Sequence, residues 1–421
     1  MNAYPVTDPQ ALDIKATIQP PRTSIQYTML YANNGGFDWA RLTQACHKLV
    51  AAHDILRTVF VEHESTFVQV VVKELDIPVV IQHAETEDLE RSAESLCAAH
   101  IDSNNFRLGA PFFYIFLLQA KDSQAECLIL GLSHSQYDGV SLPLLLRDLE
   151  ALYAGTAITP SAPFSTYLSQ TLTDGPARTE ALSYWNTLLA GSALSILPGQ
   201  TPANKASATE KAIFRTAELP AACHPPPLGI TTATLLTAGW AVVLARRLRT
   251  PDVLFGGITS GRAATDGDDT AVVMGPCYQF TPVRVHFERT WTARELLAAV
   301  QQQAAESLAH DFVGGFGAAG RDGFVDSVVH HQDWEEFESM PFAGGEVKVG
   351  IANPHGDAAR PVKLVSYVKE GGMHVGVVGA AEDDELVDGV LKELAEVVAG
   401  LVTAEEDGRV VLDEQSFQME E

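Results

Sequence analysis

The feature that constrains the fold most is an order of segments that occurs twice, a helix-like stretch followed by strand-like stretches. In the first half, residues 37–53 place apolar side chains at helical spacing, and two β-rich runs follow on either side of the polar sequence EHES. In the second half, residues 233–247 have the helical pattern, and strand-like runs follow at 251–262 and 277–288. These patterns predict a mixed α/β protein with two lobes of similar composition.

The chain of 421 residues is longer than a single hydrophobic core usually serves, which also favours two lobes. Residues 155–177 are rich in Thr, Ser, Pro and Gly, and helical and strand patterns are weak there. We therefore place the boundary there, with one lobe at 1–175 and the other at 176–421.

Charge and composition exclude several classes of protein. The net charge of -26 would repel nucleic-acid phosphates and anionic lipid. No apolar run of about 18 residues and no signal-peptide pattern is visible, which predicts a cytoplasmic protein that binds neither nucleic acid nor membrane. The five cysteines lack CxxC spacing, so we expect no disulfide framework and no metal centre; they are Cys46, Cys97, Cys127, Cys223 and Cys277.

The most specific chemical signal is the sequence SHSQYDG at residues 133–139. Strand-like runs at 111–120 and 125–134 precede it, and a helical pattern at 141–153 follows it. The heptapeptide therefore lies on a loop between a strand and a helix, where functional side chains are commonly presented to a cleft.

His134 is the candidate catalytic residue. A neutral imidazole can accept a proton from an attacking amine or hydroxyl near neutral pH. It can equally position the nucleophile and stabilise a developing oxyanion without holding the proton. The sequence leaves these two roles open.

Asp138 and Gly139 are expected to shape the loop. A carboxylate at position 138 can tie the loop to a cation elsewhere, and Arg284 in TPVRV is the candidate partner. Gly139 would adopt a backbone conformation closed to other residues and allow a substrate to approach.

A single HxxxDG match is short and degenerate, but further segments accompany it in the order typical of one family. They are AAHDILRTVF, GRAATDGDDTAVVMGPCYQFTPVRV and FVDSVVHHQDW. With SHSQYDG they make nearly the whole chain resemble a condensation domain of a nonribosomal peptide synthetase, whose hallmark is HHxxxDG. The resemblance implies two lobes in a V shape, each like chloramphenicol acetyltransferase, with a tunnel between them. It also implies that Arg284 pairs with Asp138 and that Arg57 is a structural residue beside the loop.

The family's first histidine is Ser133 here, and SHxxxDG resembles the terminal condensation-like domains of fungal synthetases, including the fumiquinazoline type. This resemblance implies an acyltransferase that releases a carrier-bound peptidyl thioester by macrocyclisation, as its own amine attacks the carbonyl with help from His134. No cofactor would be bound directly, because the peptide arrives on the phosphopantetheine arm of a carrier domain upstream in the same synthetase. A monomer is expected.

Ser133 and Trp334 each have two alternative roles. Ser133 could be a nucleophile that forms an acyl-enzyme, but no GxSxG elbow is present, and neighbouring residues at a strand end point to opposite faces. A packing or loop-anchoring role for Ser133 is therefore favoured. Trp334 in HHQDW is either part of the substrate channel or a core tryptophan, and the adjacent histidines would diverge rather than bind a metal.

Three rival functions remain open from the sequence. The first is an intermolecular condensation that forms an amide or ester with a second carrier or a free acceptor. The second is a module that docks carrier domains without catalysis. The third is an acyltransferase that uses coenzyme A.

Overall fold

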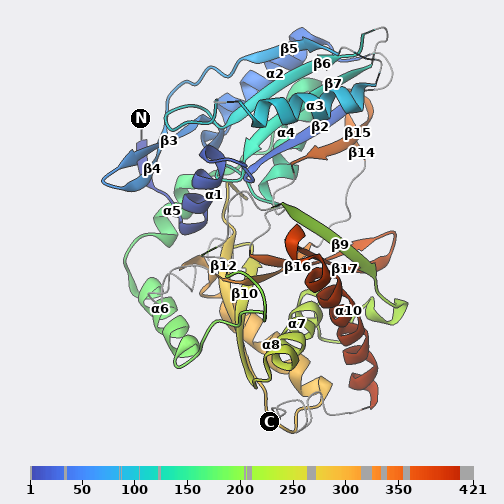
Figure 1. Cartoon of the computed structure of the whole chain (residues 1–421). Coiled ribbons are helices and arrows are strands. Elements are labelled where there is room, and N and C mark those ends of the chain that lie inside the picture. Colours follow the sequence, from blue (N-terminus) through green and yellow to red (C-terminus); the bar gives the residue numbers. More distant parts are fainter. Residues whose placement is uncertain are drawn as a thin grey trace. The chain divides into compact units, whose positions relative to one another are not determined.

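A computed structural model describes residues 2–32, 36–84, 86, 88–103, 105–121, 125–202, 205, 211–262, 272–313, 325–332, 339–353 and 361–407. The chain divides into two compact units. The first comprises Met1–Thr173, Thr265–Cys277 and Phe337–Gly356, and the second comprises Asp174–Ala264, Tyr278–Glu336 and Asp357–Glu421. Figure 1 shows the elements of each unit.

The first unit is built on a six-stranded sheet with the order β14-β15-β2-β7-β6-β5. Neighbouring strands are antiparallel except β5 and β6, which are parallel. The strands are β14 (Ser339–Phe342), β15 (Gly345–Ala352), β2 (Ile25–Ala32), β7 (Glu126–Ser133), β6 (Phe113–Gln119) and β5 (Val79–His83).

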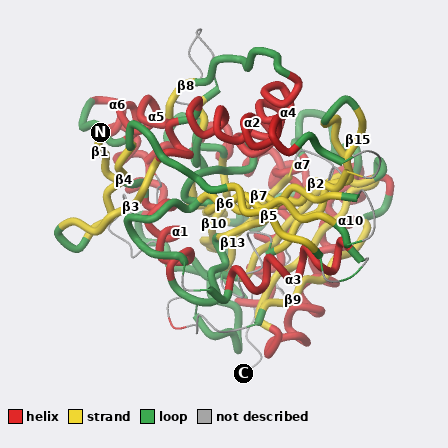
Figure 2. The backbone as a smooth tube through the Cα atoms, turned by 90° about the horizontal axis from the view of Figure 1, so that it is seen from above, coloured by secondary structure: helices red, strands yellow, loops and turns green. Residues whose placement is uncertain are grey.

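Strand β7 is the centre of this sheet, and all eight of its residues are buried. Its side chains alternate between two apolar clusters, with Leu128, Leu130 and Leu132 in one and Cys127 and Ile129 in the other. Helices α2 (Trp39–Ala52) and α4 (Ser141–Ala154) supply the first cluster, and α3 (Leu89–Ile101) supplies the second. Figure 2 shows α2 and α4 side by side. Because both faces are covered, the end of β7 is a rigid support for the loop that follows it.

Smaller elements complete the first unit. A three-stranded sheet has the order β1-β4-β3, and a short parallel pair joins β8 to β11. The remaining elements are β1 (Asn2–Pro5), α1 (Asp8–Ile18), η1 (Asp54–Arg57), β3 (Thr58–His63), β4 (Thr66–Val71), β8 (Ala162–Pro163), α5 (Phe164–Thr171) and β11 (Val273–Met274). The predicted hairpin around EHES is confirmed as the antiparallel pair β3 and β4.

The second unit has its own six-stranded sheet, with the order β12-β10-β13-β16-β17-β9. Helices α7, α8 and α10 pack on the sheet through a core in which Trp240 is fully buried. The elements are α6 (Pro176–Leu189), β9 (Ala212–Glu218), η3 (Ala221–Cys223), α7 (Thr232–Leu248), β10 (Asp252–Thr259), β12 (Gln279–His286), α8 (Ala293–Leu308), η4 (Asp311–Val313), β13 (Ser327–Gln332), β16 (Val362–Lys369), β17 (Gly372–Ala380), η5 (Ala381–Asp383) and α10 (Asp384–Asp407).

The two units are not consecutive halves of the sequence, as the predicted lobes at 1–175 and 176–421 are. The main boundary lies at Thr173/Asp174, close to the predicted one after residue 175. However, β11 and the hairpin of β14 and β15 come from the second half of the chain and belong to the first unit. The physical reason for the hairpin is backbone pairing, since β15 is hydrogen-bonded along β2. Periodicity predicts that a segment is a strand but not which sheet it joins.

Within the described ranges, no helix is both long enough and apolar enough to cross a membrane.

Gly275, just after β11, offers a test of how tightly the first unit is packed near the loop. Its φ is +149°, and a Cβ there would lie 2.6 Å from Cδ2 of Phe164 at the start of α5. We expect Gly275→Ala to lower the free energy of unfolding by about 2–4 kcal/mol, because backbone strain and a steric clash add. Denaturant unfolding measures this loss.

Gly155→Ala is the matched control for that experiment. Gly155 ends α4 with φ +80°, and nothing lies within 4 Å of the position of a Cβ. It should lose only about 1 kcal/mol from strain. Equal losses in the two variants would contradict the clash with Phe164.

Candidate active site

The loop from the end of β7 to the start of α4 carries the predicted site. His134 is half-buried, whereas Ser133 and Asp138 are buried. The main-chain N–H of His134 donates to the carbonyl oxygen of Ser24 at 2.8 Å. Its ring packs against Tyr137 with centroids 4.3 Å apart and an interplanar angle of 40°. Main chain and ring of His134 are therefore both held by neighbours in the first unit.

Asp138 ties the loop to two different parts of the first unit. Its Oδ1 accepts from the N–H groups of Val140 and Ser141, at 3.2 and 2.9 Å, and from the Ser141 hydroxyl at 3.0 Å. A carboxylate is stabilised there, because the N–H groups at a helix start carry partial positive charge. Its Oδ2 accepts from the N–H of Cys277 at 2.9 Å. Asp138 thus has the structural kind of role expected for it, and its donors include three main-chain N–H groups and the Ser141 hydroxyl.

Ser133 anchors the loop to α1. Its hydroxyl lies 2.7 Å from the hydroxyl of Thr17 and 2.7 Å from that of Ser135, and it also accepts from the N–H of Ser135. The side chain is completely buried. This chain of hydroxyls matches the anchoring role and leaves the Ser133 oxygen engaged away from solvent.

Gln136 and Gln10 hold the loop from two further sides. Nε2 of Gln136 donates to the carbonyl oxygens of Ile55 and Thr58, at 2.9 and 3.2 Å. Nε2 of Gln10 donates to the carbonyl oxygen of Ser135 at 2.9 Å. Arg57 lies between the two residues that Gln136 contacts, and its guanidinium binds Asp54 and the carbonyl oxygens after β4. Arg57 therefore supports the loop indirectly, by fixing the segment to which Gln136 binds.

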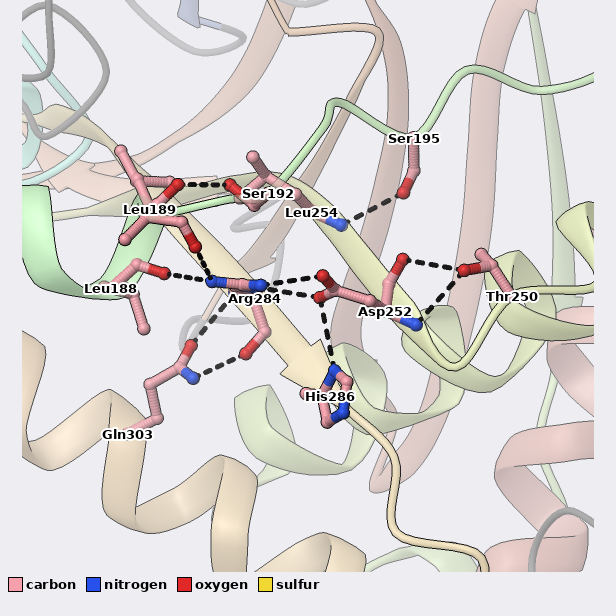
Figure 3. A network of polar contacts seen from close by, with 11 residues as sticks. Leu188, Leu189, Ser192, Ser195, Thr250, Asp252, Leu254, Arg284, His286 and Gln303 are labelled. Carbon is pink, nitrogen blue, oxygen red and sulfur yellow. Dashed lines mark hydrogen bonds and ion pairs between the residues drawn. The ribbon is translucent and has the colours of Figure 1, made fainter.

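Arg284, the predicted partner of Asp138, makes its ion pair with a different carboxylate, within the second unit. Arg284 makes a two-pronged ion pair with Asp252 on the neighbouring strand, with Nε–Oδ1 and Nη2–Oδ2 distances of 2.8 and 2.7 Å. Its Nη1 donates to the carbonyl oxygens of Leu188 and Ala190 at the end of α6, each at 2.8 Å (Figure 3). The physical reason is register: Arg284 stands opposite Leu254 in the antiparallel pair of β10 and β12, within reach of Asp252 two residues away.

Three other predictions have mixed outcomes. Gly139 is not among the described glycines with positive φ, so the special conformation expected for it is not found. Trp334 lies outside the described residues, and its role stays a prediction. Nδ1 of His331 lies 2.7 Å from the Ser366 hydroxyl, and the described residues contain no cluster of three or more side chains suited to a metal.

The N-terminal segment also supports the loop, which no pattern in the sequence predicted. Thr17 and Gln10 lie on α1, Ser24 follows that helix, and all three bind the loop. A signal was present, because Thr7 and Gln10 form a capping box with Pro9 in the first turn of the helix. That spacing could have predicted the helix but not its place against the loop.

The chain is similar to known proteins in sequence and in fold. The sequence pattern of the Condensation domain family matches residues 1–315. The chain is 53% identical over 424 residues to nonribosomal peptide synthetase sidD of Aspergillus fumigatus, covering 99% of this chain and 20% of that protein. It is 33% identical to nonribosomal peptide synthetase 1 of Ajellomyces capsulatus, covering 96% of this chain and 22% of that protein. The chain thus spans about a fifth of these relatives.

Solved structures show the same fold. One described as "The crystal structure of CT" has a TM-score of 0.82 and 24% identity, covering 98% of this chain and 92% of that one. The starter condensation domain of rhizomide synthetase RzmA has a TM-score of 0.74 and 16% identity, covering 97% and 96%. The expected mixed α/β architecture is confirmed by these likenesses, with open sheets rather than closed barrels.

Ser133→Ala tests the anchoring role. The variant should unfold at a free energy lower by about 1–3 kcal/mol, because the buried hydroxyls of Thr17 and Ser135 lose a partner. It should still consume thioester, and intact-protein mass spectrometry should find no acylated protein in either form. An acyl adduct on the wild type that Ser133→Ala abolishes would contradict the anchoring role.

Asp252→Asn tests the corrected partner of Arg284. The hydrogen bonds from Arg284, followed by its charge, lower the pKa of Asp252 against the opposing effect of burial. Stability from a lowered carboxyl pKa is present above the usual value of about 3.9 and is lost as pH falls through the folded-state pKa. Asp252→Asn should therefore melt below wild type near neutral pH, and the difference should shrink once the pH falls below about 4.

Arg284→Gln is the companion variant in this experiment. It should keep a deficit at low pH, because it also loses the bonds to the carbonyl oxygens of Leu188 and Ala190. A melting-temperature deficit of Asp252→Asn that does not change with pH would be inconsistent with the ion pair.

Proposed function

The chain belongs to the condensation-domain family of nonribosomal peptide synthetases, amide-bond-forming domains of the acyltransferase type, and from this premise we propose that it releases a carrier-bound peptide by macrocyclisation. The substrate would be a peptidyl thioester on the phosphopantetheine arm of a carrier domain in the same synthetase. The attacking group would be an amine of the peptide itself.

The observation that carries the proposal is that the loop around His134 is held firmly by its neighbours. His134 is half-buried, in a loop whose polar groups Ser133, Ser135, Gln136 and Asp138 are buried and bound to their surroundings. A loop held in this way presents one imidazole at a fixed place, and fixed placement is a large part of catalytic efficiency in acyl transfer.

The reaction needs little from the protein beyond such placement. The amine nitrogen attacks the thioester carbon, the C–N bond forms, and the carbonyl oxygen becomes negatively charged. Collapse of this intermediate breaks the C–S bond and releases the arm as a thiolate, which leaves more easily than an alkoxide. The amine's proton passes to His134, or is held by it during the attack, and then returns to the thiolate.

Two observations favour terminal release over the other reactions of the family. Ser133 replaces the family's first histidine, as in the terminal condensation-like domains that this chain resembles, and its hydroxyl serves the loop rather than chemistry. The structures that share the fold include one described as "The crystal structure of holo T3CT", with a TM-score of 0.82, and CT denotes a terminal condensation-like domain. Intermolecular amide or ester formation and carrier docking without catalysis are the alternatives that the experiment must separate.

The test is mass spectrometry of the products from a synthetic peptidyl thioester loaded on a carrier protein. Wild-type protein should give a product one water lighter than the hydrolysed acid. His134→Ala should lower the rate by about 100-fold or more, the contribution typical of a positioned acid–base group.

Ser133→Ala run in parallel controls for damage to the loop, since it should keep the product pattern. A heavier product that contains a second acceptor would show that the reaction is intermolecular and not a cyclisation. Equal turnover by wild type and His134→Ala, with carrier binding intact, would leave the docking function instead.

A further inference from the structure

His53 and Asp148 make a polar contact in the interior of the first unit. Nε2 of His53 lies 3.1 Å from Oδ2 of Asp148, and the two side chains are 2% and 1% exposed. Nδ1 of His53 lies 3.4 Å from the hydroxyl of Ser161. Apolar side chains of similar size in the place of a buried polar pair are often neutral or favourable for stability. Stability alone therefore does not explain why polar groups occupy these positions.

The contact brings three segments of the first unit together at one imidazole. His53 lies between the end of α2 and the start of η1. Its N–H donates to the carbonyl oxygen of Leu49, and its carbonyl oxygen accepts from the N–H of Leu56, each at 3.1 Å. Asp148 lies within α4, and Ser161 directly precedes β8. Segments that are far apart in the sequence are thus held at the side chain of His53.

The SHSQYDG loop is bound to η1, to α4 and to the segment after β11, the partner strand of β8. Gln136 donates to the carbonyl oxygen of Ile55 in η1. Oδ1 of Asp138 accepts from the N–H of Ser141 at the start of α4, and its Oδ2 accepts from the N–H of Cys277 after β11. The contacts of His53 therefore join the supports of the loop to one another, about two turns of α4 away from the loop itself.

Resting on the function proposed above, we propose that His53 is a positioning residue for His134. Its contacts with Asp148 and Ser161 fix η1, α4 and β8 relative to one another, and these segments support the loop directly or through β11. A polar contact is satisfied in one relative arrangement, whereas apolar packing tolerates small shifts. Small shifts matter, because a displacement of about 1 Å can lower the rate at a positioned catalytic group by about 100-fold.

His53 acts through these segments and not on the substrate, because its side chain is buried. The other oxygen of Asp148, Oδ1, lies 3.1 Å from Nη2 of Arg147, whose side chain is 54% exposed. Removing His53 alone therefore leaves a buried carboxylate beside a surface cation. Breaking one side of a buried pair is strongly destabilising, so the pair has to be replaced as a whole.

The test replaces both partners by leucine. His53→Leu/Asp148→Leu removes the polar contact and fills the space, so it should melt close to the wild-type temperature. Hydrogen–deuterium exchange followed by mass spectrometry then measures the protection of the loop, in which the N–H groups of His134 and Gln136 are hydrogen-bonded. We expect peptides that cover residues 134–141 to exchange about tenfold faster than in the wild type.

Activity is the second readout for the double variant. Its kcat for loss of the carrier-bound thioester, whichever product forms, should fall by about tenfold with little change in KM. The reason is that His134 would be displaced, whereas the surfaces that bind the substrate would not be.

Asp148→Asn is a second variant, and it keeps the shape of the wild-type side chain, so its folding does not depend on how leucines pack. It weakens the contact by removing the charge, since bonds to an ionised acceptor are about twice as strong as neutral ones. We expect exchange of the loop to rise by about threefold. This variant decides the question alone if the double variant does not fold.

Leu118→Ala is the matched control. Leu118 is buried in the apolar cluster on the other face of the sheet, and it stands opposite Cys127 near the start of β7, away from the loop. The cavity should lower the melting temperature more than the double leucine variant does, while exchange of the loop and kcat stay within about twofold of wild type.

Exchange of the loop at the wild-type rate in either variant of the pair would overturn the proposal. An equal rise in Leu118→Ala would overturn it as well, because a general loss of stability would then be the cause. Faster exchange with an unchanged kcat would also contradict it, because the loosened loop would then not displace His134. Exchange is measured without substrate, so this result is separate from whether the wild-type protein releases a cyclic product.

Discussion

The carboxylate of Asp138 is the interaction on which the site depends. One oxygen accepts three hydrogen bonds at the start of α4, and the other accepts the N–H of Cys277. Bonds to an ionised acceptor are each worth about 1.5–3 kcal/mol. This one side chain therefore fixes where the loop ends, where α4 begins and where the segment after β11 passes. The position of His134, four residues earlier, follows from these attachments.

The rest of the first unit makes the loop rigid from the other end. Strand β7 is buried on both faces, so the chain enters the loop from the stiffest part of the sheet. Ser133 then binds α1, and Gln136 binds η1 and the first residue of β3. The half-buried imidazole is thus mounted among groups that have little freedom to move, which is the property that positional catalysis requires.

Local patterns predicted the elements well because they depend on neighbours in the sequence. The periodic segments became α2, α4 and α7 nearly at their expected limits, and SHSQYDG lies at the junction of β7 and α4 as predicted. Side-chain partners were harder to predict because they depend on strand register and on distant segments. Arg284 pairs with Asp252 because β12 lies antiparallel to β10, which no local pattern reveals. The hairpin of β14 and β15 joined the sheet of the first unit for the same reason. Thr17 and Gln10 reach the loop from α1, whose capping signal does not indicate where the helix packs, and Ser24 reaches it from the segment after that helix.

The central claim is that acyl transfer takes place at the imidazole of His134. The most direct measurement is a crystal structure of the protein with a non-hydrolysable analogue of the thioester, in which an amide replaces the sulfur link, attached to the arm of a carrier protein. The account predicts the analogue's carbonyl carbon close to the imidazole, with the attacking amine within about 3.2 Å of a ring nitrogen. An analogue whose carbonyl lies elsewhere, beyond reach of His134 even through one water, would contradict the account.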